Sequence, residues 1–107
     1  MNEARIDLLK KYIEEDPTDP FNYYGLACEY VQTKPEEALR IFKTLLKDYA
    51  EYLPTYYQTG QLLEAYELED EALEVYAQGM ILAKTQGNNK TFQELNSVHQ
   101  NLLFEME

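Results

Sequence analysis

A chain of 107 residues has the length of a single domain and can bury a substantial core. Its composition, 45% hydrophobic with four Gly and four Pro, is typical of a globular protein and argues against extended disorder. Nine Lys and Arg against twenty Asp and Glu give a net charge of −11, which makes nucleic acid and anionic membranes poor partners.

The single cysteine, Cys28, cannot form an internal disulfide, and no thiolate-rich metal cluster is available. Charges are scattered through the first 17 residues, so this segment fits neither a signal peptide nor a membrane span. We therefore expect a cytoplasmic protein without a bound metal or cofactor.

Residues 2–15 are predicted to form an amphipathic helix, because Ile6, Leu9 and Ile13 recur at helical spacing. The apolar stripe is expected to be widened by three further residues, Ala4, Leu8 and Tyr12. Residues 16–20, DPTDP, end this helix, and Asp19 with Pro20 supplies the cap and first turn of the next one.

The second helix is predicted from Pro20 to about Gln32, with one face formed by Tyr23, Leu26, Ala27 and Tyr30. Thr33 precedes Glu36 by three residues, which predicts a capping box for the third helix. The buried side of that helix is expected to consist of Ala38, Ile41, Phe42, Leu45 and Leu46, before it frays near residues 49–53.

Pro54 opens a fourth helix, and residues 56–83 contain two helices that separate near residues 67–70, where no glycine marks the turn. Small residues allow their backbones to approach closely at Gly60, Ala72 and Gly79. Residues 85–90 form a break, after which Asn89 or Thr91 is expected to cap a last helix. Its apolar stripe is Phe92, Leu95, Val98 and Leu102, whereas Leu103, Phe104 and Met106 lie off the stripe and are either exposed or paired with a second subunit.

A period of 34 residues separates Ala4, Ala38 and Ala72, and the same period separates Leu8, Phe42 and Tyr76. Two segments repeat one pattern: Tyr23-x-x-Leu26-Ala27-x-x-Tyr30 followed by Ala38-x-x-x-Phe42, and Tyr56-x-x-Thr59-Gly60-x-x-Leu63 followed by Ala72-x-x-x-Tyr76-x-x-Gly79. This pattern resembles the tetratricopeptide repeat, a helix-turn-helix unit of 34 residues. The sequence departs from the family in having Tyr for the leading Trp, Ala27 for Gly, and Thr59 and Leu63 for Leu and Tyr.

The resemblance implies an all-α fold, a right-handed α-solenoid of stacked antiparallel hairpins with about six helices. The 107 residues would then form one domain, divided into a partial-repeat helix (1–16), two repeats (20–53 and 54–87) and a C-terminal capping helix (89–105).

Proteins similar to this one hold a peptide or a partner helix on a concave face lined by the first helix of each hairpin. Tyr24 and Tyr57 occupy equivalent places, and both rings could face one ligand; alternatively they cover neighbouring helices. The resemblance assigns the concave face to nine residues: Tyr24, Cys28, Val31, Tyr57, Gln61, Glu64, Gln93, Ser97 and Gln100. The cations with which one subgroup grips a carboxylate are absent, because the matching places hold Tyr24, Cys28, Tyr57 and Gln61.

The leading hypothesis is a non-enzymatic module that binds a protein or peptide, with an acidic rim that favours basic ligands. The alternative is a structural protein that self-associates, with a homodimer formed through the C-terminal helix. No acid, base, nucleophile or metal set converges at any spacing, so we predict no catalytic residues.

Overall fold

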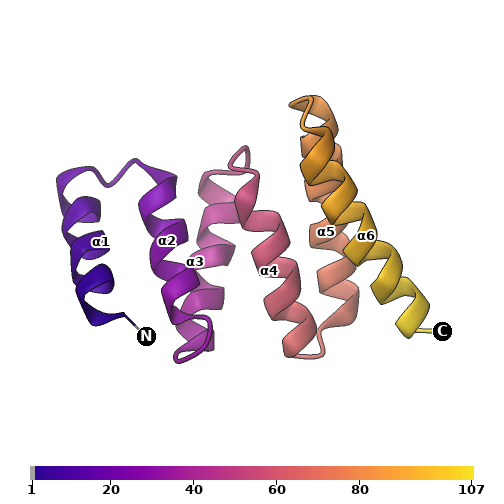
Figure 1. Ribbon diagram of the computed structural model, residues 1–107, viewed down its shortest axis with the longest axis horizontal. Helices are drawn as coiled ribbons and strands as arrows, with labels where there is room; N and C mark the ends of the chain where they lie inside the picture. Colours follow the sequence, from indigo (N-terminus) through magenta and orange to yellow (C-terminus); the bar gives the residue numbers. More distant parts are fainter. Residues whose placement is uncertain (1) are drawn as a thin grey trace. The chain divides into compact units, whose positions relative to one another are not determined.

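The computed structural model describes residues 2–107, and within them it contains helices and turns but no β-strand. Residue 1 of the predicted partial-repeat helix lies outside the described residues. The helices, drawn in Figure 1, are α1 (Glu3–Glu15), α2 (Pro20–Tyr30), α3 (Pro35–Asp48), α4 (Pro54–Ala65), α5 (Glu69–Thr85) and α6 (Asn89–Glu105). The prediction of an all-α helical repeat fold is confirmed.

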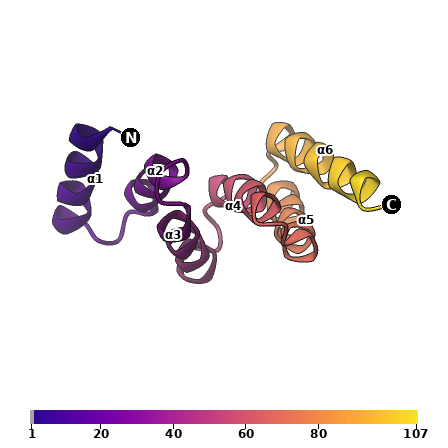
Figure 2. The ribbon, with the colours of Figure 1, turned by 90° about the horizontal axis from the view of Figure 1, so that it is seen from below.

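The chain divides into a compact first unit that ends at Thr55 and a second unit, Tyr56–Glu107. The first two residues of α4 belong to the first unit and the rest of that helix to the second. In the first unit, α2 packs against both α1 and α3. In the second unit, α5 lies beside both α4 and α6, as Figure 2 shows.

Short polar side chains begin the first two helices. The Asn2 side chain accepts a hydrogen bond from the backbone N–H of Arg5 (3.0 Å), and Asp19 accepts one from Phe21 (3.0 Å). The cap predicted at Asp19, with Pro20 as the first helical residue, is therefore confirmed.

The predicted junction between α2 and α3 is wrong in two details. First, α2 ends at Tyr30 rather than near Gln32, because the amides of Thr33 and Lys34 both turn back to the Tyr30 carbonyl (3.2 and 2.7 Å). Second, Lys34 is the N-cap of α3 and makes no side-chain capping bond. Thr33 lies one residue too early to form the expected capping box.

Only part of the predicted apolar stripe of α1 is buried. Ile6 and Leu9 are each 3% exposed, but Leu8 and Tyr12 are 45% and 42% exposed, and Ala4 is exposed as well. The wider stripe is therefore a wrong prediction. The equivalent residues of the repeat, Ala38 and Phe42 on α3 and Ala72 and Tyr76 on α5, are fully buried. The helices α3 and α5 therefore bury the face that α1 leaves open.

The second unit depends on a glycine where α4 meets α5. A Cβ atom built on Gly60 would lie 2.1 Å from Cε1 of Tyr76, whose side chain is fully buried. The predicted close approach at Gly60 therefore occurs, and the ring of Tyr76 occupies the space that a side chain at position 60 would need.

The turn between α4 and α5 has the geometry of a helix end that usually requires glycine. Glu67 has φ of 61°, and the amides of Glu67 and Leu68 donate to the carbonyls of Glu64 and Leu63 (both 2.9 Å). Gly87 adopts the same left-handed conformation between α5 and α6. A glutamate at the first position explains why the sequence marks that turn so weakly.

The last helix is capped by Asn88, whose side chain accepts from the Thr91 amide (3.0 Å), so neither predicted cap, Asn89 or Thr91, is correct. Leu95 and Leu102 of the predicted stripe are buried against the rest of the second unit. The three apolar residues off the stripe are exposed: Leu103 by 40%, Phe104 by 76% and Met106 by 40%.

Candidate functional site

The outward face of α2 carries an aromatic cluster centred on Tyr24. Its ring lies 6.2 Å from the ring of Phe42 and 5.7 Å from the ring of Tyr52, and the planes of the second pair are inclined by 62° in an edge-to-face arrangement. Edge-to-face pairs at these distances are favourable and limit the freedom of the rings. Tyr24 therefore covers Phe42, as one of the two alternatives predicts, and it remains half-exposed, so that contact with a ligand stays a prediction.

Cys28 lies one helical turn after Tyr24 and is also half-buried. Burial raises the pKa of its thiol, whereas a hydrogen bond from Tyr24 acts in the opposite direction. A raised pKa keeps the thiol neutral near pH 7, which disfavours a nucleophilic role. Val31 follows as the C-cap of α2, half-buried, so it lies just beyond the helix on which we placed it.

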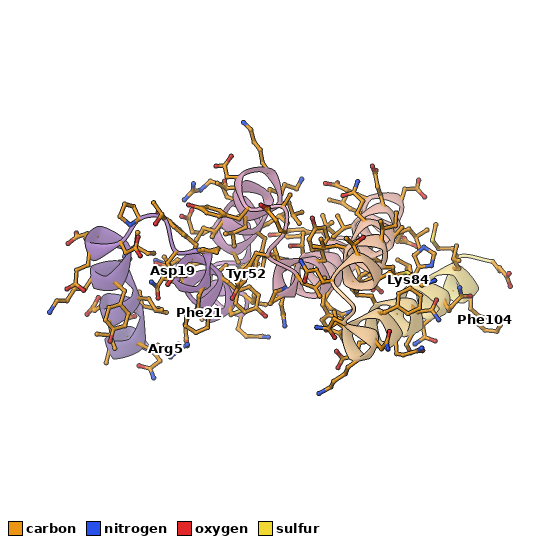
Figure 3. All side chains as sticks on the ribbon, turned by 90° about the horizontal axis from the view of Figure 1, so that it is seen from above. Arg5, Asp19, Phe21, Tyr52, Lys84 and Phe104 are labelled. Carbon is orange, nitrogen blue, oxygen red and sulfur yellow. The ribbon has the colours of Figure 1, made fainter. Side chains whose placement is uncertain are left out.

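Two residues on or beside this face of α2 escape the sequence prediction. Tyr52 belongs to the turn after α3, and Phe21, which is 54% exposed, lies on α2 one turn before Tyr24. Figure 3 labels both, together with Asp19 at the start of α2. Because α3 runs back along α2, the turn that follows α3 returns to the start of α2. The antiparallel hairpin alone would therefore have predicted that Tyr52 lies near Tyr24. We call Phe21, Tyr24, Cys28 and Tyr52 the first-unit face.

Charges border the first-unit face at both ends of α2. Burial raises the pKa of Tyr52, and the nearby Asp19 carboxylate raises it further. At the other end, Arg5 of α1 forms an ion pair with Glu29 (2.8 Å). The Arg5 cation is therefore already balanced, and Asp19 leaves the border of this face acidic.

In the second unit, Tyr57, Gln61 and Glu64 recur along α4 at helical spacing, as predicted, and we call them the second-unit face. Two of them hold the hydroxyl of Tyr76. Gln61 Nε2 donates to that hydroxyl (2.6 Å), which in turn donates to Glu64 Oε2 (2.5 Å). Burial and the Glu64 carboxylate both raise the pKa of Tyr76. The polar groups of this face are thus engaged with the core of their own unit.

The three candidates on α6, Gln93, Ser97 and Gln100, are exposed and lie on the side opposite Leu95 and Leu102. Their side chains have no hydrogen-bond partner among residues 2–107. They form a polar, solvated surface with no aromatic anchor.

The part of the chain that the structure describes offers no group of three or more His, Cys, Asp and Glu side chains placed to hold a metal ion. Over the same residues, every helix is too short or too polar to cross a membrane. The arrangement on both faces is suited to noncovalent contacts.

Comparison with known proteins gives matches among solved structures. No protein-family model matches the chain, and no curated protein matches it. The solution NMR structure of a tetratricopeptide repeat domain protein from Salinibacter ruber is 35% identical, with a TM-score of 0.77 over 81% of this chain and 89% of that one. The crystal structure of a tetratricopeptide repeat domain protein from the same organism is 34% identical, with a TM-score of 0.76 over 78% of this chain and 96% of that one.

Proposed function

This chain belongs to the tetratricopeptide repeat family, and we propose that it is a non-enzymatic module that binds a peptide or a partner helix on the first helices of its hairpins. Membership indicates a protein–protein interaction module in general, of a kind that is typically a scaffold rather than an enzyme. The finer proposal concerns which surface binds and what chemistry it selects.

The observation that carries the proposal is the first-unit face. Phe21 is 54% exposed, and the rings of Tyr24 and Tyr52, 5.7 Å apart, are half-buried and keep part of their surface accessible. Tyrosine is a frequent anchor at interfaces because it combines apolar area with a hydroxyl and loses little conformational entropy. A surface of this kind is suited to an apolar or aromatic side chain of a ligand.

The charge of the chain favours a basic ligand. Asp19 borders the first-unit face, and the protein as a whole carries a net charge of −11. Complementary charge mainly accelerates encounter and excludes wrong partners, so the effect should weaken with added salt.

The second-unit face is proposed as a weaker contributor. Gln61 Nε2 and Glu64 Oε2 already hold the hydroxyl of Tyr76, so these two side chains have only their remaining donor and acceptor atoms for a ligand, whereas Tyr57 is half-exposed. The exposed Gln93, Ser97 and Gln100 are proposed to extend the binding surface with polar contacts only.

The test begins with capture of partners from the native source, identified by mass spectrometry. The affinity of the identified partner is then measured calorimetrically for Tyr24→Ser and Tyr57→Ser, with Tyr12→Ser as the matched control. Tyr12 is also partly exposed, by 42%, but lies on α1. We expect the largest loss, at least about tenfold, for Tyr24→Ser. Equal affinities for all variants, with folding confirmed by circular dichroism, would contradict the proposal.

The second candidate function is self-association through the end of α6. The observation that favours it is the exposed apolar group Leu103, Phe104 and Met106, of which Phe104 is 76% exposed. Adjacent exposed apolar residues are typical of contact surfaces. Light scattering over a range of concentrations tests it: a dimer that Phe104→Ser abolishes supports this function, and a strict monomer at high concentration excludes it.

A further inference from the structure

A cleft of about 560 Å³ lies between α1 and α3, on the side of α2 that carries Tyr23, Leu26 and Tyr30. These residues lie on a different face of α2 from Tyr24 and Cys28, so the cleft is separate from the first-unit face. Every residue that lines it belongs to the first unit. Its volume falls within the range of about 300–1,000 Å³ that is usual for ligand sites.

The floor of the cleft is apolar and its end wall is fixed. Leu26, Tyr30 and Leu45 on the floor are almost fully buried. The rings of Tyr23 and Tyr49 stack at 6.4 Å in the end wall, and both hydroxyls donate to the carbonyl of Pro17 (2.9 and 3.4 Å). These bonds hold both rings in place, so little ordering is required when a ligand binds.

The charges along the cleft are unequal at its two ends. Near Tyr30, Arg40 is paired with Glu37, and Lys10 lies close enough to lower the pKa of that glutamate further. At the other end lie Glu14 and Asp48, whose side chains have no hydrogen-bond or ion-pair partner among residues 2–107. The uncompensated charge at this end is therefore negative.

The C-terminal carbonyl groups of α1 add to this negative charge, whereas Lys47 compensates those of α3 and Asp19 caps the N-terminus of α2 at the same end of the cleft. Figure 1 shows α1 and α3 running in the same direction, with α2 antiparallel between them, so α1 and α3 end at the same mouth of the cleft. The last turn of α1 contains no basic residue to compensate its carbonyl groups. A cation is stabilised next to a helix C-terminus, where the carbonyl groups of the last turn are unpaired.

We propose that this cleft binds a partner peptide in which an apolar side chain stands next to lysine or arginine. The apolar side chain rests on Leu26 and against the rings of Tyr23 and Tyr49, and the cation lies between Glu14 and Asp48. A charge-assisted hydrogen bond to either carboxylate fixes the orientation of the peptide. An acidic peptide is excluded, because it would place like charges together at the mouth.

The test uses the full chain and two synthetic probes, a helical peptide of leucine and lysine and the same peptide with glutamate in place of lysine. Binding is followed by ¹H–¹⁵N NMR. The lysine probe is expected to move the amide signals of Ile13, Thr44 and Tyr49 in a saturable manner, and the glutamate probe to move none of them. Shifts that map to Tyr24 and Cys28 instead, or no saturable shifts, would overturn the assignment.

Matched variants separate the cleft from the general acidity of the protein. The double variant E14Q/D48N is expected to bind the lysine probe with about three- to tenfold lower affinity than the wild type. The control E94Q/E107Q removes the same number of charges from the second unit and should leave the affinity nearly unchanged. Equal weakening by both would show that binding is unspecific attraction and would contradict the proposal.

A third variant tests the apolar part of the cleft. Thr44 lines it with an exposed side chain, so Thr44→Trp should fill the space and block the probe while the helix is preserved. Full binding to a folded Thr44→Trp protein would show that the probe lies elsewhere. If Thr44→Trp does not fold, the affinities of E14Q/D48N and E94Q/E107Q for the lysine probe still test whether the probe binds in the cleft.

Discussion

The two units place different pairs of residues at the same positions of the repeat. The first unit has Ala27 and Phe42, and the second has Gly60 and Tyr76. In the second unit the glycine allows the tyrosine ring to approach, and the ring carries its hydroxyl to Gln61 and Glu64. Phe42 has no hydroxyl, and the matching positions in the first unit hold Cys28 and Val31.

This difference explains why the two candidate faces differ in chemistry. Without a buried hydroxyl to satisfy, the first unit leaves its face to aromatic and apolar side chains. The second unit must provide hydrogen-bond partners for Tyr76, because a buried hydroxyl without a partner is costly. The residue at the position of Phe42 and Tyr76 in the core is therefore linked to the polarity of the residues on the face above it.

The largest effect is expected for Gly60→Ala. A methyl group at this position would collide with the ring of Tyr76, which is fully buried and cannot swing away. We expect a loss of about 2–3 kcal/mol in the free energy of unfolding, measured with urea. Gly25→Ala is the control, since its nearest neighbour is the Leu9 Cδ2 atom at 3.2 Å, the end of a flexible side chain. A Gly60→Ala protein as stable as Gly25→Ala would contradict the packing described.

The next largest effect is expected for Phe42→Tyr, which introduces the hydroxyl of the second unit into the first. Phe42 is fully buried, and Cys28 and Val31 offer no equivalent of the Gln61 and Glu64 side chains. We expect a loss of about 1–3 kcal/mol on urea unfolding. Adding Cys28→Gln and Val31→Glu should recover part of the lost stability. A triple variant no more stable than Phe42→Tyr would contradict our explanation of the difference between the two units.

Tyr76→Phe removes the hydroxyl from the second unit and should cost about 1 kcal/mol near pH 7. The pKa of Tyr76 is raised in the folded state, so below the ordinary tyrosine value of 10.0 its contribution to stability is constant. Above that value the unfolded chain loses its proton first, and stability falls by about 1.4 kcal/mol per pH unit. Between pH 8 and pH 11, the free energy of unfolding measured with urea should fall less steeply with pH for Tyr76→Phe than for the wild type. Parallel curves would argue against a raised pKa at this residue.

The smallest effect is expected for Glu67→Gly, and it is a gain. Glu67 adopts φ of 61°, a conformation that costs an L-residue about 1–2 kcal/mol. Glycine removes that strain but adds freedom to the unfolded chain, so we expect a net gain of up to about 1 kcal/mol in thermal unfolding. A loss of stability would mean that the glutamate side chain supports the turn.

Helical spacing and the 34-residue period predict the elements well, because both depend on residues such as Phe42, Tyr76 and Leu95 that are fully buried. Helix caps and turns that depend on backbone conformation are harder to predict from the sequence. The turn at Glu67 lacks the glycine that would reveal it, and Thr33 resembles a cap although Lys34 occupies that place. The local sequence pattern alone does not show which residue caps a helix or adopts a positive φ.

The candidate faces show a similar limit. Spacing along one helix places Tyr24 with Cys28, and Gln61 with Glu64, but Tyr52 arrives from a turn 28 positions later in the chain than Tyr24. The hydroxyl of Tyr76 likewise reaches Glu64 from another helix. Such contacts depend on tertiary structure and carry no signal in the spacing of one segment. The nine predicted surface residues remain predictions as ligand contacts.

The most direct test of the central claim is to map the captured partner onto the chain by ¹H–¹⁵N NMR. If the first helices bind the partner, the largest shifts should fall on Tyr24, Cys28 and Tyr52, and Tyr24→Ser should remove them. Shifts confined to other surfaces, with the amides of α2 unchanged, would contradict the claim.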